Sequence, residues 1–505
     1  MLSRYSSAIF FSLMFFFLCY FFIKVHPLFV FDTDDWAYIQ DTRAGRAWPL
    51  WGEWNPTKVF PEVFMPIISW LSVIVVYPFN NDYIEALSFG FGITLSCFVI
   101  ILGIQFVKFC DVFFKFLRFE SLLFCLFFLL FLFYPLYRHR NLYLLQSVDV
   151  TCIFNYTIPA LLNFTVVLFL ISINQSRENG EINYFSLSIL IFAVYFSLNS
   201  NLFQSIILVS YVLSFIFFSV YDDIRKNKRF SLSLVYKEIR NCIHKSTLYF
   251  IIFVYFLIVL VYEANGGRAS EYSTGLLELD VKSSIKSFLE SIDKLQRPFH
   301  FLLSVNIFGV VLYFYKKRQH SLQPIDINYI NLLLKLVASF IITISFLIML
   351  CSKTGVYYLT RTDVVLSYVL YILFASLCSV SYIYKSIVVR YHVAFSLLPL
   401  FAILLLIRVV LCDTRYAETS MSNSPITVTK KISDDIVSQI ISADKSSCSE
   451  IEILVPKFSS SDNMPLALYG SQRIPSALYN HRIISREVRV KFIPDESINS
   501  KYKID

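Results

Sequence analysis

The sequence predicts a polytopic α-helical membrane protein with a small α/β domain at its C-terminus. Of its 505 residues, 56% are hydrophobic and 16% are charged, and the mean hydropathy is +0.62. Apolar segments recur along most of the chain, and each is long enough to cross about 30 Å of hydrocarbon. After residue 411 these segments stop and the sequence becomes polar. We therefore expect a transmembrane module over residues 1–411 and a soluble domain over residues 412–505.

About eleven apolar segments are predicted to span the membrane. They cover approximately residues 7–23, 84–107, 120–137, 155–173, 184–198, 202–220, 247–262, 299–315, 330–350, 364–384 and 392–411. Two of them, 184–198 and 247–262, are short. A further apolar stretch, Val63–Phe79, lies between the first two segments, and its placement decides the orientation of everything that follows.

Basic residues resolve that placement, because cytoplasmic loops carry an excess of Lys and Arg. If Val63–Phe79 does not cross, the basic loops at 108–119, 221–246, 316–320 and 385–390 all fall on the cytoplasmic side. If it crosses, all of them fall outside. We therefore expect Val63–Phe79 to be a helix that lies along the outer face of the membrane or dips into it. The N-terminus is then cytoplasmic, and both the first loop, at about residues 24–83, and the C-terminal region are extracytoplasmic.

The polar C-terminal region contains two candidate strands. Ile451–Val455 is rich in β-branched residues and is followed by Pro456, and Val488–Ile493 is followed by Pro494. Short runs of this kind, ended by proline, are typical of strands. They predict a small α/β or mixed domain on the outer face of the membrane.

The first loop contains an unusual group of acids. Asp32, Asp34 and Asp35 lie close together after the first apolar segment, and Glu62 follows further along the loop. Carboxylates this close repel one another, so such a group indicates a site that binds a metal ion or keeps one carboxylate as a base. A solvated acidic turn is the alternative. These four acids are the candidate catalytic residues, and the sequence leaves open whether a divalent cation binds at the aspartates.

Several cations are expected on the outer face, where the positive-inside rule disfavours them. The candidates for substrate binding are Lys58, Arg138, Arg140, Arg268 and Arg361. An anionic ligand such as a lipid phosphate would explain them, and contact with lipid headgroups is the alternative. Despite the net charge of +8, no basic stripe is dense enough to neutralise a nucleic-acid backbone, so we expect no nucleic-acid partner.

The layout of the whole chain resembles the GT-C superfamily of membrane glycosyltransferases. The shared features are a first helix, a large outer loop with an acidic pair and surface helices, many further spans, and a C-terminal extracytoplasmic domain. The resemblance implies that a sugar is taken from a polyprenyl-phosphate carrier and that an acid of the first outer loop is central to catalysis. The matching residues are Asp32, Asp34 and Asp35, with Glu62 as a second carboxylate.

Within this superfamily, the size of the chain, its Asp34-Asp35-Trp36 sequence and its polar tail look most like the serotype-converting O-antigen glucosyltransferases of bacteria and their phages. That resemblance implies transfer of a sugar, with glucose expected, from undecaprenyl phosphate to lipid-linked O-antigen. The reaction would take place on the periplasmic side of the bacterial inner membrane. Asp34 and Asp35 are then the candidates for the base. The candidates for phosphate binding are Lys58, Arg138, Arg140 and Arg361. Cations alone can hold a monophosphate leaving group, so the need for a metal stays open.

Two other functions remain open at this point. An O-antigen polymerase or ligase would place its key arginine in a large mid-chain outer loop, which here is the 263–298 loop with Arg268. A lipid-linked sugar flippase or other transporter would need functional charges inside the spans and no folded tail. The spans of this chain are nearly free of charge, and its tail is long.

Overall fold

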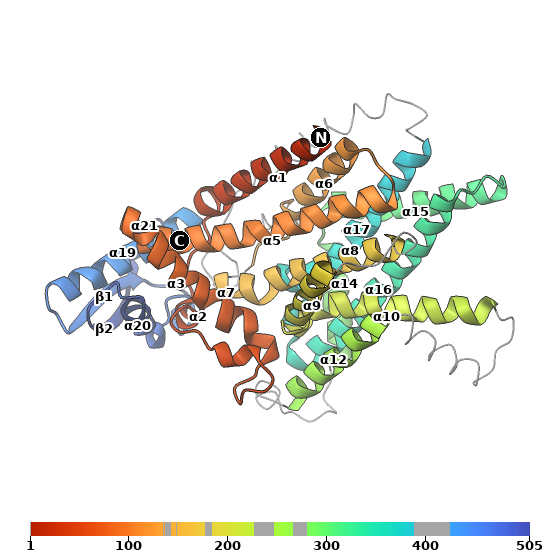
Figure 1. Cartoon of the computed structure of the whole chain (residues 1–505). Helices are drawn as coiled ribbons and strands as arrows, with labels where there is room; N and C mark the ends of the chain where they lie inside the picture. Colours follow the sequence, from red (N-terminus) through yellow and green to blue (C-terminus); the bar gives the residue numbers. More distant parts are fainter. Residues whose placement is uncertain are drawn as a thin grey trace. The chain divides into compact units, whose positions relative to one another are not determined.

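The computed structural model of the chain describes residues 2–134, 136, 143–147, 149–176, 184–226, 247–265, 280–387 and 425–504. The chain divides into two compact units (Figure 1). The first consists of Met1–Ile100, Gln146–Ile158 and Cys412–Asp505, and the second of Ile101–Leu145 and Pro159–Leu411. The C-terminal region therefore belongs to the same unit as the first hundred residues.

The first unit is built on an antiparallel pair of apolar helices. α1 (Leu2–Tyr20) continues into a π-helical turn, and α5 (Tyr83–Phe113) begins beside its end. Lys24, just after α1, pairs with Glu85 in the first turn of α5. A side chain at Gly92 would meet Ile23 at 2.9 Å, so the two helices are in close contact here. The chain thus leaves α1 and enters α5 at the same end of this helix pair.

The apolar stretch that decides the topology lies in a helical segment from Phe60 to Asn80. It comprises a π-helical turn followed by α3 (Met65–Val75) and α4 (Tyr77–Asn80). By length and composition it could cross a membrane. α3 packs against the start of α5, since a Cβ at Gly90 would lie 1.7 Å from Ser72 Oγ. The end of α1 and the start of α5 lie at the same end of the helix pair. The Phe60–Asn80 segment therefore belongs to a part of the chain that leaves this end and returns to it.

The C-terminal region forms a small parallel two-stranded sheet with helices against it. β1 (Glu450–Pro456) pairs with β2 (Arg489–Asp495), with Ile453 opposite Phe492. Both of these side chains are buried, and α19 (Ile426–Lys445) packs against β1. The other helices of this region are α20 (Arg473–Asn480) and α21 (Glu496–Tyr502). Both predicted strands are therefore confirmed, each within a residue or two of its expected bounds.

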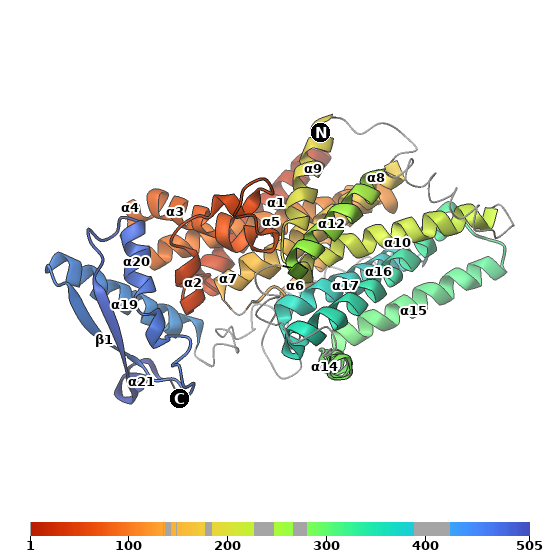
Figure 2. The same ribbon diagram turned by 90° about the horizontal axis from the view of Figure 1, so that it is seen from below.

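The second unit is a bundle of long apolar helices. Its helices, besides the second half of α5, are α6 (Arg118–Leu132), α8 (Ile158–Ser176), α9 (Tyr184–Leu198), α10 (Leu202–Lys226), α12 (Thr247–Asn265), α14 (Val281–Asp293), α15 (Arg297–Arg318), α16 (Pro324–Thr354) and α17 (Thr362–Ile387). α16 packs against α10 and α17, and α15 packs against α17 (Figure 2). Serine, threonine and tyrosine hydroxyls bridge these helices, as between Ser210 and Thr343 at 2.8 Å.

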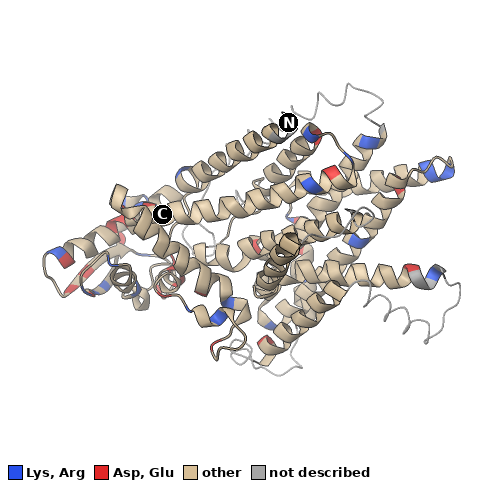
Figure 3. Cartoon of the chain, viewed as in Figure 1, with Lys and Arg blue, Asp and Glu red and all other residues tan. Residues whose placement is uncertain are grey.

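Many basic residues of this bundle lie at the end where α5, α15 and α17 finish (Figure 3). Lys385 Nζ, at the end of α17, donates to the carbonyl of Lys115, in the turn after α5, at 3.4 Å. Lys316 Nζ, at the end of α15, pairs with Asp326 at 2.9 Å and donates to Ser386 at 3.0 Å. Three of the basic loops that the charge rule assigns to the cytoplasm therefore lie at the same end.

Among the described residues, nine helices are long and apolar enough to cross a membrane. Eight of these coincide with expected spans, and the ninth is the Phe60–Asn80 segment. Two expected spans form shorter helices: α6 and α9 have 15 residues each, which is about 22 Å. The last expected span, 392–411, lies outside the described residues. The chain is thus a mostly helical, multi-pass membrane protein with a small C-terminal sheet.

Candidate functional site

The acidic sequence of the first loop forms the start of a short helix, α2 (Thr33–Tyr38). Asp32 is its N-cap, and its Oδ1 accepts a hydrogen bond from the backbone N–H of Asp34 at 3.0 Å. In return, the backbone N–H of Asp32 donates to Oδ2 of Asp35 at 3.3 Å. This reciprocal arrangement is a capping box, which satisfies donors that a helix start leaves open. Part of the acidic character of the loop is therefore explained by local structure.

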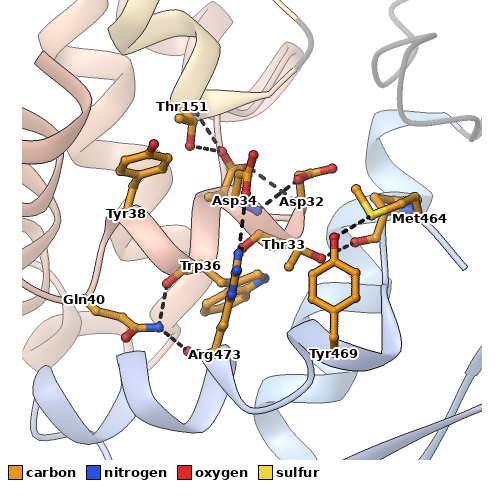
Figure 4. Close-up of polar contacts among 12 residues, drawn as sticks. Asp32, Thr33, Asp34, Trp36, Tyr38, Gln40, Thr151, Met464, Tyr469 and Arg473 are labelled. Carbon is orange, nitrogen blue, oxygen red and sulfur yellow. Dashed lines mark hydrogen bonds and ion pairs between the residues drawn. The ribbon is translucent and has the colours of Figure 1, made fainter. Parts of the chain in front are cut away.

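Asp35 is completely buried, and both of its oxygens accept hydrogen bonds. Oδ2 accepts from the backbone N–H groups of Phe31 at 3.2 Å and of Asp32 at 3.3 Å. Oδ1 accepts from the N–H and from the hydroxyl of Thr151, both at 2.8 Å (Figure 4). Asp35 thereby ties the first loop to the segment around α7 (Val150–Cys152), more than a hundred residues further along the chain.

Asp149, the N-cap of α7, adds a further carboxylate that the sequence analysis did not select. Burial, with Asp149 and Asp34 nearby, raises the pKa of Asp32 to about 7. Burial and the charges of Asp149 and Asp32 also raise the pKa of Asp35 well above its usual value, and the donors of Thr151 oppose that rise. The buried acids Asp32 and Asp35 therefore form a cluster with the partly exposed Asp149.

Asp34 is the exposed member of the first-loop acids, with 69% of its side chain accessible. Its Oδ1 lies 3.4 Å from Nη1 of Arg473, which also donates to the carbonyl of Thr33 at 2.9 Å (Figure 4). Arg473 is the first residue of α20, in the C-terminal region. The sequence analysis missed this arginine because it lies 439 residues from Asp34, and no local pattern links the two.

The C-terminal region contacts the first loop at several further points. Thr33 Oγ1 donates to the carbonyl of Pro465 at 2.9 Å, and Gln40 Nε2 donates to the carbonyl of Arg473 at 3.0 Å. His481 lies between Ile39 and Tyr83. Its Nε2 donates to the carbonyl of Ile39 at 3.0 Å, and its Nδ1 lies 2.7 Å from the hydroxyl of Tyr83. Burial lowers the pKa of His481 to about 4. The imidazole is therefore neutral at pH 7, and its Nδ1 accepts from the tyrosine hydroxyl.

Glu62, the fourth candidate acid, is buried and held by cations of its own loop. Its Oε2 lies 3.1 Å from Arg46 Nε and 3.3 Å from Arg43 Nη1. Lys58, a candidate for phosphate binding, donates to the hydroxyl of Tyr38 at 3.2 Å, at the end of α2. Both residues therefore belong to the first unit, as the acidic cluster does.

The other predicted cations are distributed differently. Arg361 belongs to the second unit and forms a bidentate pair with Asp363. Arg138, Arg140 and Arg268 lie outside the described residues. In the part of the chain that the structure describes, no group of three or more His, Cys, Asp or Glu side chains is arranged to hold a metal ion.

Comparisons of the chain with protein-family models, with curated proteins and with solved structures found no match. The function must therefore be inferred from the chemistry of the site.

Proposed function

We propose that this chain is a membrane glycosyltransferase that moves a sugar, with glucose expected, from undecaprenyl phosphate to a lipid-linked O-antigen at the periplasmic face. The observation that carries the proposal is the pair of buried acids Asp32 and Asp35, with Asp149 nearby and the exposed carboxylate of Asp34 beside them. Buried like charges are costly, and such clusters concentrate at functional sites. A transferase of this kind needs a carboxylate with a raised pKa as a base, and Asp32 has one.

The topology supports a periplasmic site. Basic ends of α5, α15 and α17 gather together, which favours the cytoplasm for that end of the bundle. α5 has 31 residues and crosses once, so the loop before Tyr83 belongs to the opposite side from the turn after Phe113. Lys24 pairs with Glu85, so the end of α1 lies beside the start of α5. If the Phe60–Asn80 segment crossed the membrane on its own, these two ends would lie on opposite sides, so the pairing supports a segment that does not cross. The first-loop acids would then face the periplasm, and the N-terminus the cytoplasm.

The proposed reaction assigns different roles to the three aspartates. Asp32 accepts the proton of the acceptor hydroxyl while that oxygen attacks C1 of the sugar. The bond from C1 to the phosphate oxygen breaks, and its electron pair leaves with undecaprenyl phosphate. Attack from the face opposite to the phosphate inverts the configuration at C1. Asp34, which is exposed, orients the acceptor by accepting from its hydroxyl groups. Asp35, with both oxygens occupied, positions the helix that carries the other two.

Cations would stabilise the charge that develops on the leaving phosphate. Lys58 supports this role in the first unit, because it contacts Tyr38, the last residue of α2, and remains partly exposed. Arg138, Arg140 and Arg361 remain candidates from the sequence. The membrane lipid is a partner of the whole chain, and its long apolar helices provide the surface for the undecaprenyl group.

The test is a transfer assay with the full chain in proteoliposomes, with undecaprenyl-phosphate glucose as donor and lipid-linked O-antigen as acceptor. Asp32→Asn keeps a capping side chain and removes the base, so we expect transfer to fall at least about 100-fold. Asp34→Asn should lower it about tenfold. Asp462→Asn, at an exposed position of the C-terminal region, is the matched control and should leave it unchanged. Wild-type transfer in both Asp32→Asn and Asp34→Asn would exclude this assignment of the site.

A further inference from the structure

Arg473 contacts the first-loop acids through one edge of its guanidinium group. Nη1 donates to the carbonyl of Thr33 at 2.9 Å and lies 3.4 Å from Asp34 Oδ1. The guanidinium carbon lies 5.9 Å from the centre of the Tyr469 ring, which is itself 65% exposed. About a third of the arginine side chain, 35%, remains accessible. The group is therefore placed at the surface of the site rather than within the core of the C-terminal region.

The backbone of Arg473 is also bonded to the first loop, at a residue that follows α2. Its carbonyl accepts from Gln40 Nε2 at 3.0 Å, and Gln40 Nε2 also donates to the carbonyl of Trp36 at 3.0 Å. The next residue of α20, Ile474, has a buried side chain. The arginine is thus held at both ends, and α20 cannot move away from α2 without breaking these contacts.

The charged groups around Asp32 show how the contact of Arg473 affects the pKa of Asp32. Asp34 and Asp35 lie in α2, the helix that Asp32 caps, and Asp149 caps α7. Arg473, from α20, is a cation near these acids. Burial and the neighbouring acids raise the pKa of Asp32, whereas Arg473 acts in the opposite direction. Without Arg473, the negative charge of the four carboxylates, Asp32, Asp34, Asp35 and Asp149, would be less well compensated.

We propose that Arg473 is a positioning residue of the site: it fixes Asp34 and the start of α2, and it limits the build-up of negative charge around Asp32. The C-terminal region is then a working part of the site. The catalytic consequence of this inference rests on the proposed function, but the electrostatic part does not, and the two can be tested separately.

The electrostatic test is an infrared pH titration of the purified full chain in lipid nanodiscs. The difference between wild type and Asp32→Asn isolates the carboxyl band of Asp32, with a midpoint near pH 7 expected in the wild-type background. In Arg473→Gln the same midpoint should move to higher pH. Arg489→Gln removes an exposed arginine of β2 in the same region and should not move it. An unchanged midpoint in Arg473→Gln would overturn the proposal.

The catalytic test uses the transfer assay at pH 6 and pH 8. Arg473→Gln should lose about twofold more transfer at pH 6 than at pH 8, relative to wild type, which corresponds to an ion pair worth about 0.4 kcal/mol. Arg473→Lys keeps the charge and should recover the wild-type pH profile, at a lower rate because an ammonium group lacks the two-pronged geometry.

The outcomes separate the two proposals. An inactive Asp32→Asn with a wild-type rate and pH profile in Arg473→Gln would overturn the role of Arg473 alone. A fully active Asp32→Asn would overturn the proposed function, while the infrared titration still decides the electrostatic role. If Arg473→Gln does not fold, Arg473→Lys carries the test, and a wild-type transfer rate in that folded variant would overturn the positioning role.

Discussion

Two buried aspartates of this chain occupy similar positions in opposite surroundings. Asp363 and Asp35 each lie in the first turn of a helix, α17 and α2, and neither side chain is accessible. Asp363 accepts two hydrogen bonds from Arg361, at 2.6 and 3.1 Å. Asp35 accepts its bonds from neutral N–H and O–H groups and lies near the charges of Asp32 and Asp149. One site is neutralised by an ion pair, and the other accumulates acids.

This difference separates a structural carboxylate from a candidate functional one. A bidentate pair with arginine compensates a buried carboxylate, so the fold alone accounts for Asp363. A cluster of acids without such a pair is unfavourable for stability, and proteins retain such arrangements where chemistry needs them. The comparison therefore predicts that the neutralised site is destabilised when it loses one charge of its pair, whereas the acid cluster is destabilised when its carboxylates ionise.

The largest effect is expected at the neutralised site. Arg361→Met would leave Asp363 buried without its partner, and breaking a buried pair in this way costs about 4 kcal/mol. Denaturant unfolding in detergent micelles would measure the loss. Arg361→Met combined with Asp363→Asn removes both charges and should recover most of it. A double variant that is stable but lacks transfer would support a role for Arg361 in phosphate binding, whereas an unchanged stability of Arg361→Met would contradict the comparison.

The acid cluster should show the reverse behaviour with pH. The pKa of Asp32 is about 7 in the folded chain, against an ordinary value of 3.8. Between these values the folded state binds more protons than the unfolded state, so this group's contribution to stability is lost as pH rises from about 4 to 7. Relative to Asp32→Asn, wild type should lose roughly 3 kcal/mol over that range. Thermal unfolding of both proteins at pH 5 and pH 8 would measure it, and equal pH dependence would show that Asp32 is not strained by its neighbours.

A smaller loss of stability is expected from Asp35→Asn. One amide oxygen can still accept from Thr151, but the amide N–H₂ would then face the N–H groups of Phe31 and Asp32, which lose their acceptor. We expect a loss of about 2 kcal/mol from these unsatisfied donors. Chemical denaturation would measure it, with Asp462→Asn as control. A variant that keeps wild-type stability but has lost transfer would contradict the positioning role and support Asp35 as the base.

The sequence predicted those parts of the fold that depend on local pattern. Long apolar segments predicted most of the spans, and β-branched runs ended by Pro456 and Pro494 predicted both strands. The span expected at 120–137 was too long, because α6 ends at Leu132, shortly before Pro135 in the sequence. The capping role of Asp32 and Asp35 could also be predicted from the sequence, because an acid three residues after an N-cap aspartate matches a capping box.

Only some of the residues of the site could be predicted from the sequence. The first-loop acids stand out because they are adjacent in sequence, and the structure keeps them together. Asp149 and Thr151 are distant in sequence, as is Arg473, and none of them carries a local signal of binding or catalysis. Each resembles an ordinary polar residue at the start of a helix. Tertiary packing brings them to α2, and patterns of charge and hydropathy do not encode such pairings.

The smallest effect expected within the acid cluster is that of Thr151→Val. Valine has nearly the shape of threonine, so this change removes the hydroxyl donor to Asp35 Oδ1 and leaves the backbone N–H donor in place. We expect a loss of about 1 kcal/mol, measured by chemical denaturation. Thr94→Val is the matched control. Its hydroxyl donates to the carbonyl of Gly90 in its own helix, so its removal leaves no buried group without a partner. Equal losses at the two positions would mean that Thr151 contributes packing alone. A larger loss at Thr151 would mean that the four donors around Asp35 compensate its burial, as Arg361 does for Asp363.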